Sequence, residues 1–147
     1  MGIFSFFGKK QDKANESLNT AEGINLFADD LGSTVFFEKV AKLENINKKF
    51  QRGMNLLHFA CEYNNLELAE KLIARKINIE EKNDYGNTPL WTAVFNCKGK
   101  YELVDLLLAN GADPESVNHA QNTPLKFAET IGDEALIEKL KRAKKIS

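Results

Sequence analysis

The chain has 147 residues, of which 43% are hydrophobic and 28% are charged. These values are typical of one globular domain with a buried hydrophobic core. Its 20 basic and 21 acidic residues give a net charge of −1. Because domains that bind nucleic acids usually carry a clear basic excess, we expect no nucleic-acid partner.

Residues 1–20 form an apolar and charged leader, which we expect to be flexible. Its apolar stretch, residues 1–7, is too short to span a membrane. Three roles stay open for this leader. It could be a disordered tail, a flap that packs on the first folded element, or a weak docking segment for a membrane or a partner.

Three eight-residue segments of the sequence after the leader match one another. Residues 53–60, 86–93 and 121–128 align, with 33 residues from Gly53 to Gly86 and 35 from Gly86 to Gln121. A second block, residues 67–74, matches residues 102–109. Two independent blocks with a period near 33 indicate a repeat protein.

Each unit of the repeat predicts two short helices. In the pairs Thr88-Pro89 and Thr123-Pro124, a hydroxyl stands at a helix N-cap and a proline in the first turn. Leu103, Leu106 and Leu107 have the three- and four-residue spacing of a buried helix face. The helices expected from such patterns are 23–30, 34–43, 56–63, 66–74, 89–96, 101–109, 124–131 and 134–144.

These motifs resemble the ankyrin repeat, above all the Gly-x-Thr-Pro-Leu opening and the Asn-Gly-Ala-Asp close of residues 86–113. The resemblance implies an all-α fold, an ankyrin-type solenoid of about four stacked helix–turn–helix repeats with degenerate end caps. The repeats would span residues 21–50, 51–83, 84–118 and 119–147. Lys76 takes the place of the family's glycine at a helix end, which predicts a strained or differently closed C-cap there.

The resemblance also implies a non-catalytic module that binds a partner protein through a concave groove and the turns between repeats, and we expect a monomer when it is free. Tyr63, Tyr85 and Phe95 are aromatic at positions that packing within the stack does not require, whereas Trp91 could be either buried or exposed. The family's contact positions and their neighbours fall on Arg52, Met54, Glu62, Tyr63, Asp84, Tyr85, Asn87, Trp91, Phe95, Asn96, His119 and Asn122.

The sequence predicts no cofactor, metal site or catalytic residue, since it has no phosphate-binding glycine loop and no nucleophile elbow. His58 is expected to make structural hydrogen bonds between repeats. Two cysteines without a short spacing, Cys61 and Cys97, favour a reducing, cytoplasmic localisation. Cys61 is expected to be buried, and Cys97, in the extra residues 96–100, to be exposed.

Several alternatives remain open at this stage. The chain could be an immunity or inhibitor protein that blocks a cognate toxin or enzyme, a scaffold docked on a membrane by its leader, or an enzyme that uses Cys97 and His119. The extra residues 96–100 could contact a partner or be a neutral insertion. The basic run 139–145 suits the end of a helix, where the helix dipole favours cations, better than a nucleic-acid patch.

Overall fold

The computed structural model describes residues 33–146, and these divide into two compact units at the boundary between Ile46 and Asn47. The first unit contains α2 (Thr34–Ala41), whose N-cap Ser33 accepts a hydrogen bond from the backbone N–H of Phe36 at 3.1 Å. The leader and the helix expected at 23–30 lie outside the described residues.

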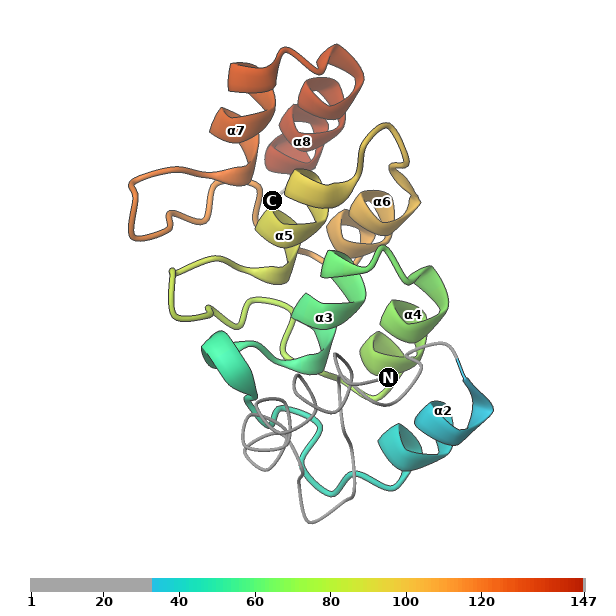
Figure 1. Cartoon of the computed structure of the whole chain (residues 1–147). Coiled ribbons are helices and arrows are strands. Elements are labelled where there is room, and N and C mark those ends of the chain that lie inside the picture. Colours follow the sequence, from blue (N-terminus) through green and yellow to red (C-terminus); the bar gives the residue numbers. More distant parts are fainter. Residues whose placement is uncertain (1–32, 147) are drawn as a thin grey trace, which may run out of the picture. The chain divides into compact units, whose positions relative to one another are not determined.

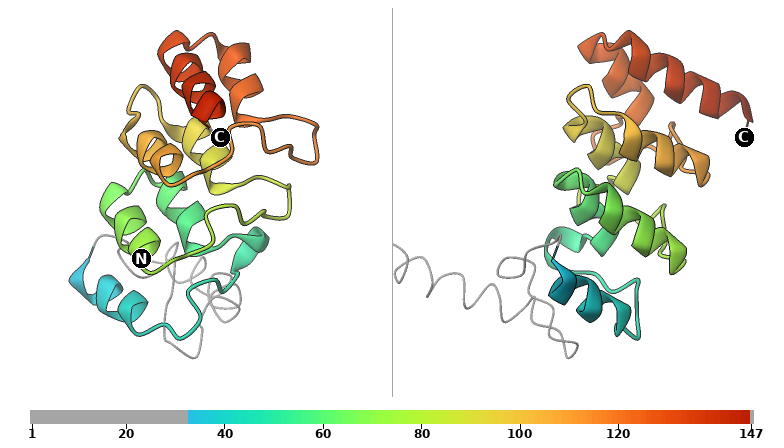
Figure 2. Two further views of the ribbon diagram at one scale, coloured as in Figure 1. Left: turned by 180° about the vertical axis from the view of Figure 1, so that it is seen from behind. Right: turned by 90° about the vertical axis from the view of Figure 1, so that its right-hand side faces the viewer.

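The second unit is a stack of three helix pairs (Figure 1). The inner helices α3 (Leu56–Glu62), α5 (Pro89–Asn96) and α7 (Pro124–Ile131) pack in a row. The outer helices α4 (Leu66–Ala74), α6 (Glu102–Ala109) and α8 (Glu134–Ile146) form a second row (Figure 2). A single 3-10 turn, η1 (Gln51–Gly53), precedes α3. Residues 33–146 contain no strand, so the expected all-α architecture is confirmed.

Side chains at the helix starts explain why the inner helices begin where they do. The Thr88 hydroxyl accepts from the backbone N–H of Trp91 at 3.4 Å, and the Thr123 hydroxyl accepts from Lys126 N–H at 3.0 Å. In α3 the Asn55 side chain takes this role and accepts from His58 N–H at 3.1 Å. Each cap satisfies a helix N–H that has no partner within its own helix.

The buried positions of the helices repeat with the period of the sequence. Ala60, Ala93 and Ala128 are buried at equivalent positions of the inner helices, where a small side chain lets neighbouring helices approach closely. The outer helices bury Leu72, Leu107 and Leu140 in the same way. One detail of the expected pattern is wrong. On α6 the buried face consists of Leu103, Val104 and Leu107, and Leu106 is only half-buried.

The predicted strain at Lys76 is confirmed. Lys76 has φ +65°, in the left-handed region, and Gly111 has φ +89° at the equivalent position. Both helix ends close with the same hydrogen bonds, Lys76 N–H to Ile73 O at 2.9 Å and Gly111 N–H to Leu108 O at 3.1 Å. The lysine therefore adopts the glycine conformation, at a cost of about 1 kcal/mol.

Loops 75–88 and 110–123 extend to one side of the inner helices, and we call them finger loops (Figure 1). Backbone hydrogen bonds of 3.0 Å join the first finger loop to η1, from Asp84 N–H to Arg52 O, and the second finger loop to the first, from His119 N–H to Tyr85 O. A Cβ on Gly86 would lie 2.8 Å from the His119 ring. Gly86 is therefore required both by its φ of +76° and by the next finger stacked against it.

Candidate functional site

A groove of about 200 Å³ lies between the finger loops and the inner helices α3 and α5. Eight of its ten lining residues are among the expected contact residues, so the fold brings these eight together at one groove. Asn83 and Thr92 are the two that the sequence did not indicate. The complete lining is Arg52, Met54, Glu62, Asn83, Tyr85, Asn87, Trp91, Thr92, Phe95 and Asn96.

Three aromatic rings form one surface at the α5–α7 side of this groove, and we call them the aromatic platform. Trp91 and Phe95 are stacked, with ring centroids 5.2 Å apart and planes 14° apart. Phe127 of α7 lies 5.5 Å from both rings. Phe95 is 54% exposed, whereas Trp91 and Phe127 are half-buried. The sequence left open whether Trp91 is buried or exposed. Its side chain is partly buried, because the neighbouring rings cover part of it.

Phe127 was missed as a platform residue because it occupies the position of Thr92 in the preceding repeat, which is not among the expected contact positions. The missed signal was its spacing. Phe127 lies in the second turn of α7, beside the same turn of α5 that carries Trp91 and Phe95. The indole Nε1 of Trp91 is buried and has no hydrogen-bond partner among the described residues.

An ion pair borders the opposite side of the groove. The Arg52 guanidinium donates to both carboxylate oxygens of Glu62, with Nη2–Oε1 and Nη2–Oε2 distances of 3.3 Å and 3.1 Å. Both side chains are partly exposed. Because each charge neutralises the other, this side of the groove offers little net charge to a partner.

The remaining expected contact residues differ in accessibility. Tyr85 is 58% exposed beside the groove, and Tyr63 is 56% exposed without lining it. Asp84 and His119 are exposed in the finger loops. Met54 is a correction, because its side chain is only 3% exposed and contributes mainly to the core.

The asparagines of the site have structural roles. Asn87 Oδ1 accepts from Asn118 Nδ2 at 2.8 Å, and Asn96 Nδ2 donates to Thr92 O at 2.8 Å. Asn122 Oδ1 accepts from the backbone N–H of Thr123 at 3.0 Å. These bonds fix the finger loops and the end of α5, so they hold the groove in shape.

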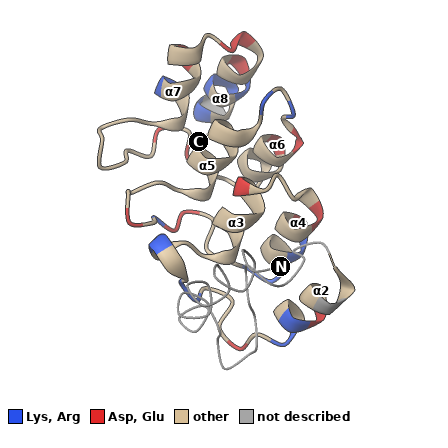
Figure 3. Cartoon of the chain, in the orientation of Figure 1, with Lys and Arg blue, Asp and Glu red and all other residues tan. Residues whose placement is uncertain are grey.

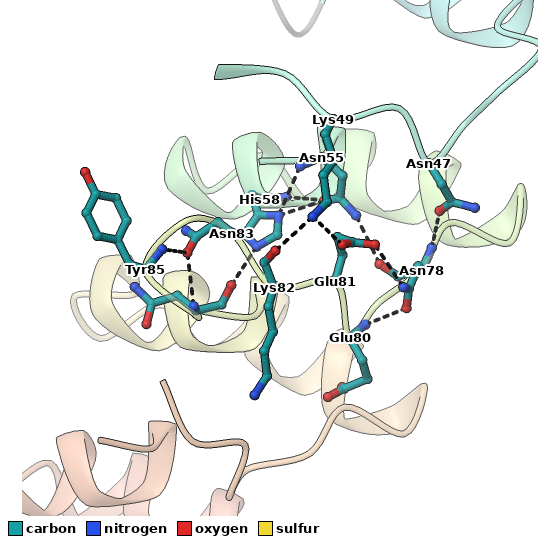
Figure 4. A network of polar contacts seen from close by, with 11 residues as sticks. Asn47, Lys49, Asn55, His58, Asn78, Glu80, Glu81, Lys82, Asn83 and Tyr85 are labelled. Atoms are coloured by element: carbon teal, nitrogen blue, oxygen red, sulfur yellow. Dashed lines mark hydrogen bonds and ion pairs between the residues drawn. The ribbon is translucent and has the colours of Figure 1, made fainter. Parts of the chain in front are cut away.

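His58 is the buried polar centre of the first joint between repeats (Figure 4). Its Nδ1 accepts from the backbone N–H of Asn55 at 3.2 Å, which leaves Nε2 to donate to Asn87 O at 2.9 Å. Burial lowers the pKa of His58 from 6.5 to about 4, so the ring is neutral at pH 7. The structural role expected for His58 is supported by these contacts.

Two surface contacts repeat along the same joints, and Figure 4 shows the first of them, from Lys49 to Lys82 O. The Lys49 ammonium donates to Lys82 O at 3.3 Å, and the Lys82 ammonium donates to Val117 O at 2.9 Å. Lys49 also lies 2.8 Å from Glu81, and this hydrogen bond lowers the pKa of the Glu81 carboxyl. Equivalent side chains thus tie each finger loop to the next.

The expected exposure of Cys97 is wrong. Cys97 is 5% exposed, and its thiol donates to Val94 O at 3.3 Å. It continues the buried stripe of Leu90, Ala93 and Val94 by one further turn, a spacing that the extra residues 98–100 concealed. Cys61 is buried as expected, and burial raises the pKa of its thiol. Neither thiol has the setting of a reactive thiolate.

The cations of α8 are paired with carboxylates. Lys139 lies 3.0 Å from Asp105, Lys144 lies 2.9 Å from Glu115, and Arg142 lies 2.8 Å from Glu138. Lys141 and Glu129 are 3.5 Å apart. Blue and red segments accordingly alternate in this region of Figure 3. The pairing offsets the local positive charge that a phosphate-binding patch would need.

Among residues 33–146, no three His, Cys, Asp or Glu side chains form a group suited to a metal ion. In the same part of the chain, every helix is too short or too polar to cross a membrane.

Comparisons with known proteins agree with the fold. Residues 28–118 match the family model described as ankyrin repeats (3 copies). The chain is 39% identical over 103 residues, 64% of its length, to human transient receptor potential cation channel subfamily A member 1, of which it covers 9%. It is 34% identical over 85 residues, 55% of its length, to the Escherichia coli protein YahD, named as an ankyrin repeat protein, of which it covers 42%. The fowlpox virus ankyrin repeat protein FPV014 is 34% identical over 82 residues, 55% of this chain and 18% of the viral protein. The chain therefore spans less than half the length of each of these relatives.

Proposed function

The chain belongs to the ankyrin repeat family, whose stacked repeats are general protein–protein interaction modules, and we propose that it binds a partner protein through the groove between its finger loops and inner helices. The binding surface is centred on Tyr85, Trp91 and Phe95. In this role the chain recognises a partner and does no chemistry of its own.

One observation carries this proposal: Tyr85 and Phe95, more than half exposed, meet the Trp91 ring at one groove. Exposing these rings to water is unfavourable unless another surface covers them, because each carries a large apolar area. Tyrosine and tryptophan are also frequent anchors of protein interfaces. The hydrogen bonds of Asn87 and Asn96 hold the backbone beneath these rings, so little order has to be gained on binding.

The experiment compares partner capture by groove variants of the full chain. Lysate proteins retained by the wild type are identified and quantified by mass spectrometry, and the captured partner is then produced and titrated by calorimetry. Tyr85→Ala and Phe95→Ala are each expected to weaken its binding by about 1–3 kcal/mol. Both side chains are largely exposed, so the fold should persist, which circular dichroism checks.

Val117→Ala is the matched control, because Val117 is another exposed apolar side chain (44%) and does not line the groove. It should capture and bind as the wild type does. Equal binding by the wild type, Tyr85→Ala and Phe95→Ala would contradict the proposal.

A further inference from the structure

We infer that the partner segment in this groove is acidic and carries an uncharged apolar or aromatic anchor. This inference rests on the proposed function and adds the chemistry of the partner. It is argued from the charges around the aromatic platform.

The charges next to the platform are positive. Between Tyr85 and Tyr101 the sequence has only two charged residues, Lys98 and Lys100. Both are exposed in the turn after α5, three and five residues beyond Phe95, and neither has a recorded ion pair or side-chain hydrogen bond within residues 33–146. Figure 3 shows this turn in blue between α5 and α6.

A third cation lies on the neighbouring inner helix. Lys126 of α7 is exposed and occupies the position that Trp91 has on α5, 35 residues earlier. Its ammonium likewise has no recorded carboxylate partner in the described part of the chain. The other charged residue of α7, Glu129, is paired with Lys141 of α8. Three exposed cations thus lie within five residues of a platform ring along the chain.

The nearby carboxylates have partners or lie in other parts of the fold, and Asp133 is held by the Tyr101 hydroxyl. Glu62 is held by Arg52, and Asp84 is exposed in a finger loop, on the side of the groove away from the helix turn. Glu102 begins the outer helix α6, where the N-terminal end of the helix dipole favours a negative charge. An acidic segment would therefore run along the α5–α7 side and leave Asp84 on its opposite side.

The anchor itself should be uncharged. The exposed face of Phe95 continues the parallel stack that begins at Trp91, so it offers a flat apolar surface to a phenyl, indole or branched aliphatic side chain. A cationic anchor would instead be repelled by Lys98, Lys100 and Lys126, the charges that follow or precede the platform rings most closely in the sequence. Like charges brought together at an interface oppose binding.

The turn that carries the two lysines is held in place. Cys97 anchors its start through the bond to Val94 O, and Lys100 N–H donates to Cys97 O at 2.8 Å. At its end, the Tyr101 hydroxyl donates to both carboxylate oxygens of Asp133, at 2.9 Å and 2.8 Å. The extra residues 96–100 therefore present their cations on a fixed backbone.

The test pans a library of short random peptides against the immobilised full chain. Enriched peptides should carry an aromatic or large aliphatic residue flanked by aspartate and glutamate. Their affinity should fall about ten-fold or more between roughly 20 mM and 300 mM NaCl, because salt screens exposed charges. The double variant Lys98→Glu and Lys100→Glu should lose these peptides by a similar factor and select basic flanks around the same anchors.

A control variant separates this effect from net charge. Lys71→Glu combined with Arg142→Glu changes the net charge equally, but both residues lie on outer helices, and this variant should select the same acidic peptides as the wild type. Peptides that depend on Phe95 but show no acidic bias would overturn the inference and leave the proposed function standing. Enriched peptides that ignore both Phe95→Ala and the lysine reversal would overturn both. Self-association of the chain that Phe95→Ala abolishes would identify a second copy as the occupant and overturn the acidic-partner inference.

Discussion

His58 and Trp91 occupy the same position in successive repeats, yet they join their repeats to the next by different means. His58 is fully buried and uses both ring nitrogens, one toward Asn55 and one toward Asn87. Trp91 is half-exposed, stacks on Phe95 and Phe127, and leaves its indole N–H unpaired among the described residues. The first joint thus depends on directional hydrogen bonds, and the second depends on ring contacts that stay partly open to solvent.

This difference suggests a division of roles along the stack. A joint that satisfies all its polar groups internally has nothing left to offer a partner. A joint closed by partly exposed rings keeps apolar area that a partner can cover. The same position of the repeat can therefore stabilise the fold in one repeat and bind a partner in the next.

The largest expected effect is a stability difference between the two joints. His58→Ala should lower the free energy of unfolding by roughly 3 kcal/mol, because it leaves the buried Asn55 N–H without a partner, removes one of the two hydrogen bonds to Asn87 O and opens a cavity in the core. Trp91→Ala should cost roughly 1–2 kcal/mol, because its ring is only partly buried. Urea denaturation of both variants measures the difference. A larger loss for Trp91→Ala than for His58→Ala would remove the proposed contrast.

The next effect is a dependence of stability on pH. The pKa of His58 is about 4 in the folded chain and near 6.5 when unfolded, so below pH 6.5 the unfolded state takes up a proton that the folded state does not. Stability should therefore be lost as the pH falls from about 6.5 to about 4, by about 2 kcal/mol at pH 5. Urea denaturation at pH 7, 6 and 5 tests this. His58→Gln should be less stable at pH 7 and show a flatter profile, and an unchanged slope would place the titration at another group.

The smallest effect comes from placing phenylalanine at each joint. Trp91→Phe removes an N–H that is buried without a partner, so stability should stay the same or rise by up to about 1 kcal/mol. His58→Phe removes two hydrogen bonds at the equivalent position and should be clearly destabilising. Thermal unfolding of the two variants compares them directly. Destabilisation of similar size in both would mean that the Trp91 N–H has a partner in solution.

Much of this molecule could be predicted from local patterns. The threonine and asparagine caps, the proline after each threonine and the periodic leucines located the helices of residues 56–146 within one or two residues. The groove positions were also predicted, since eight of the expected contact residues line it. Repeats make such transfer reliable, because each unit meets its neighbours in the same geometry.

The misses concern how deeply a side chain is buried or which rings meet, and both depend on tertiary packing. Met54 was expected to contact a partner and Cys97 to be exposed, but both side chains are buried. Leu106 looked like core but is half-buried, because α6 turns Leu103, Val104 and Leu107 toward the stack. Phe127 became part of the platform only because α7 lies against α5.

The sequence by itself determined the period of the stack, the start and end of its helices, and the strained helix end at Lys76. These depend on backbone sterics and on hydrogen bonds within a few residues, which short motifs encode. The tertiary structure alone decided which aromatic rings meet, how Trp91 and His58 came to differ, and which cations are paired. Those outcomes depend on distances between side chains about 33 residues apart, and such distances are set only when the repeats pack.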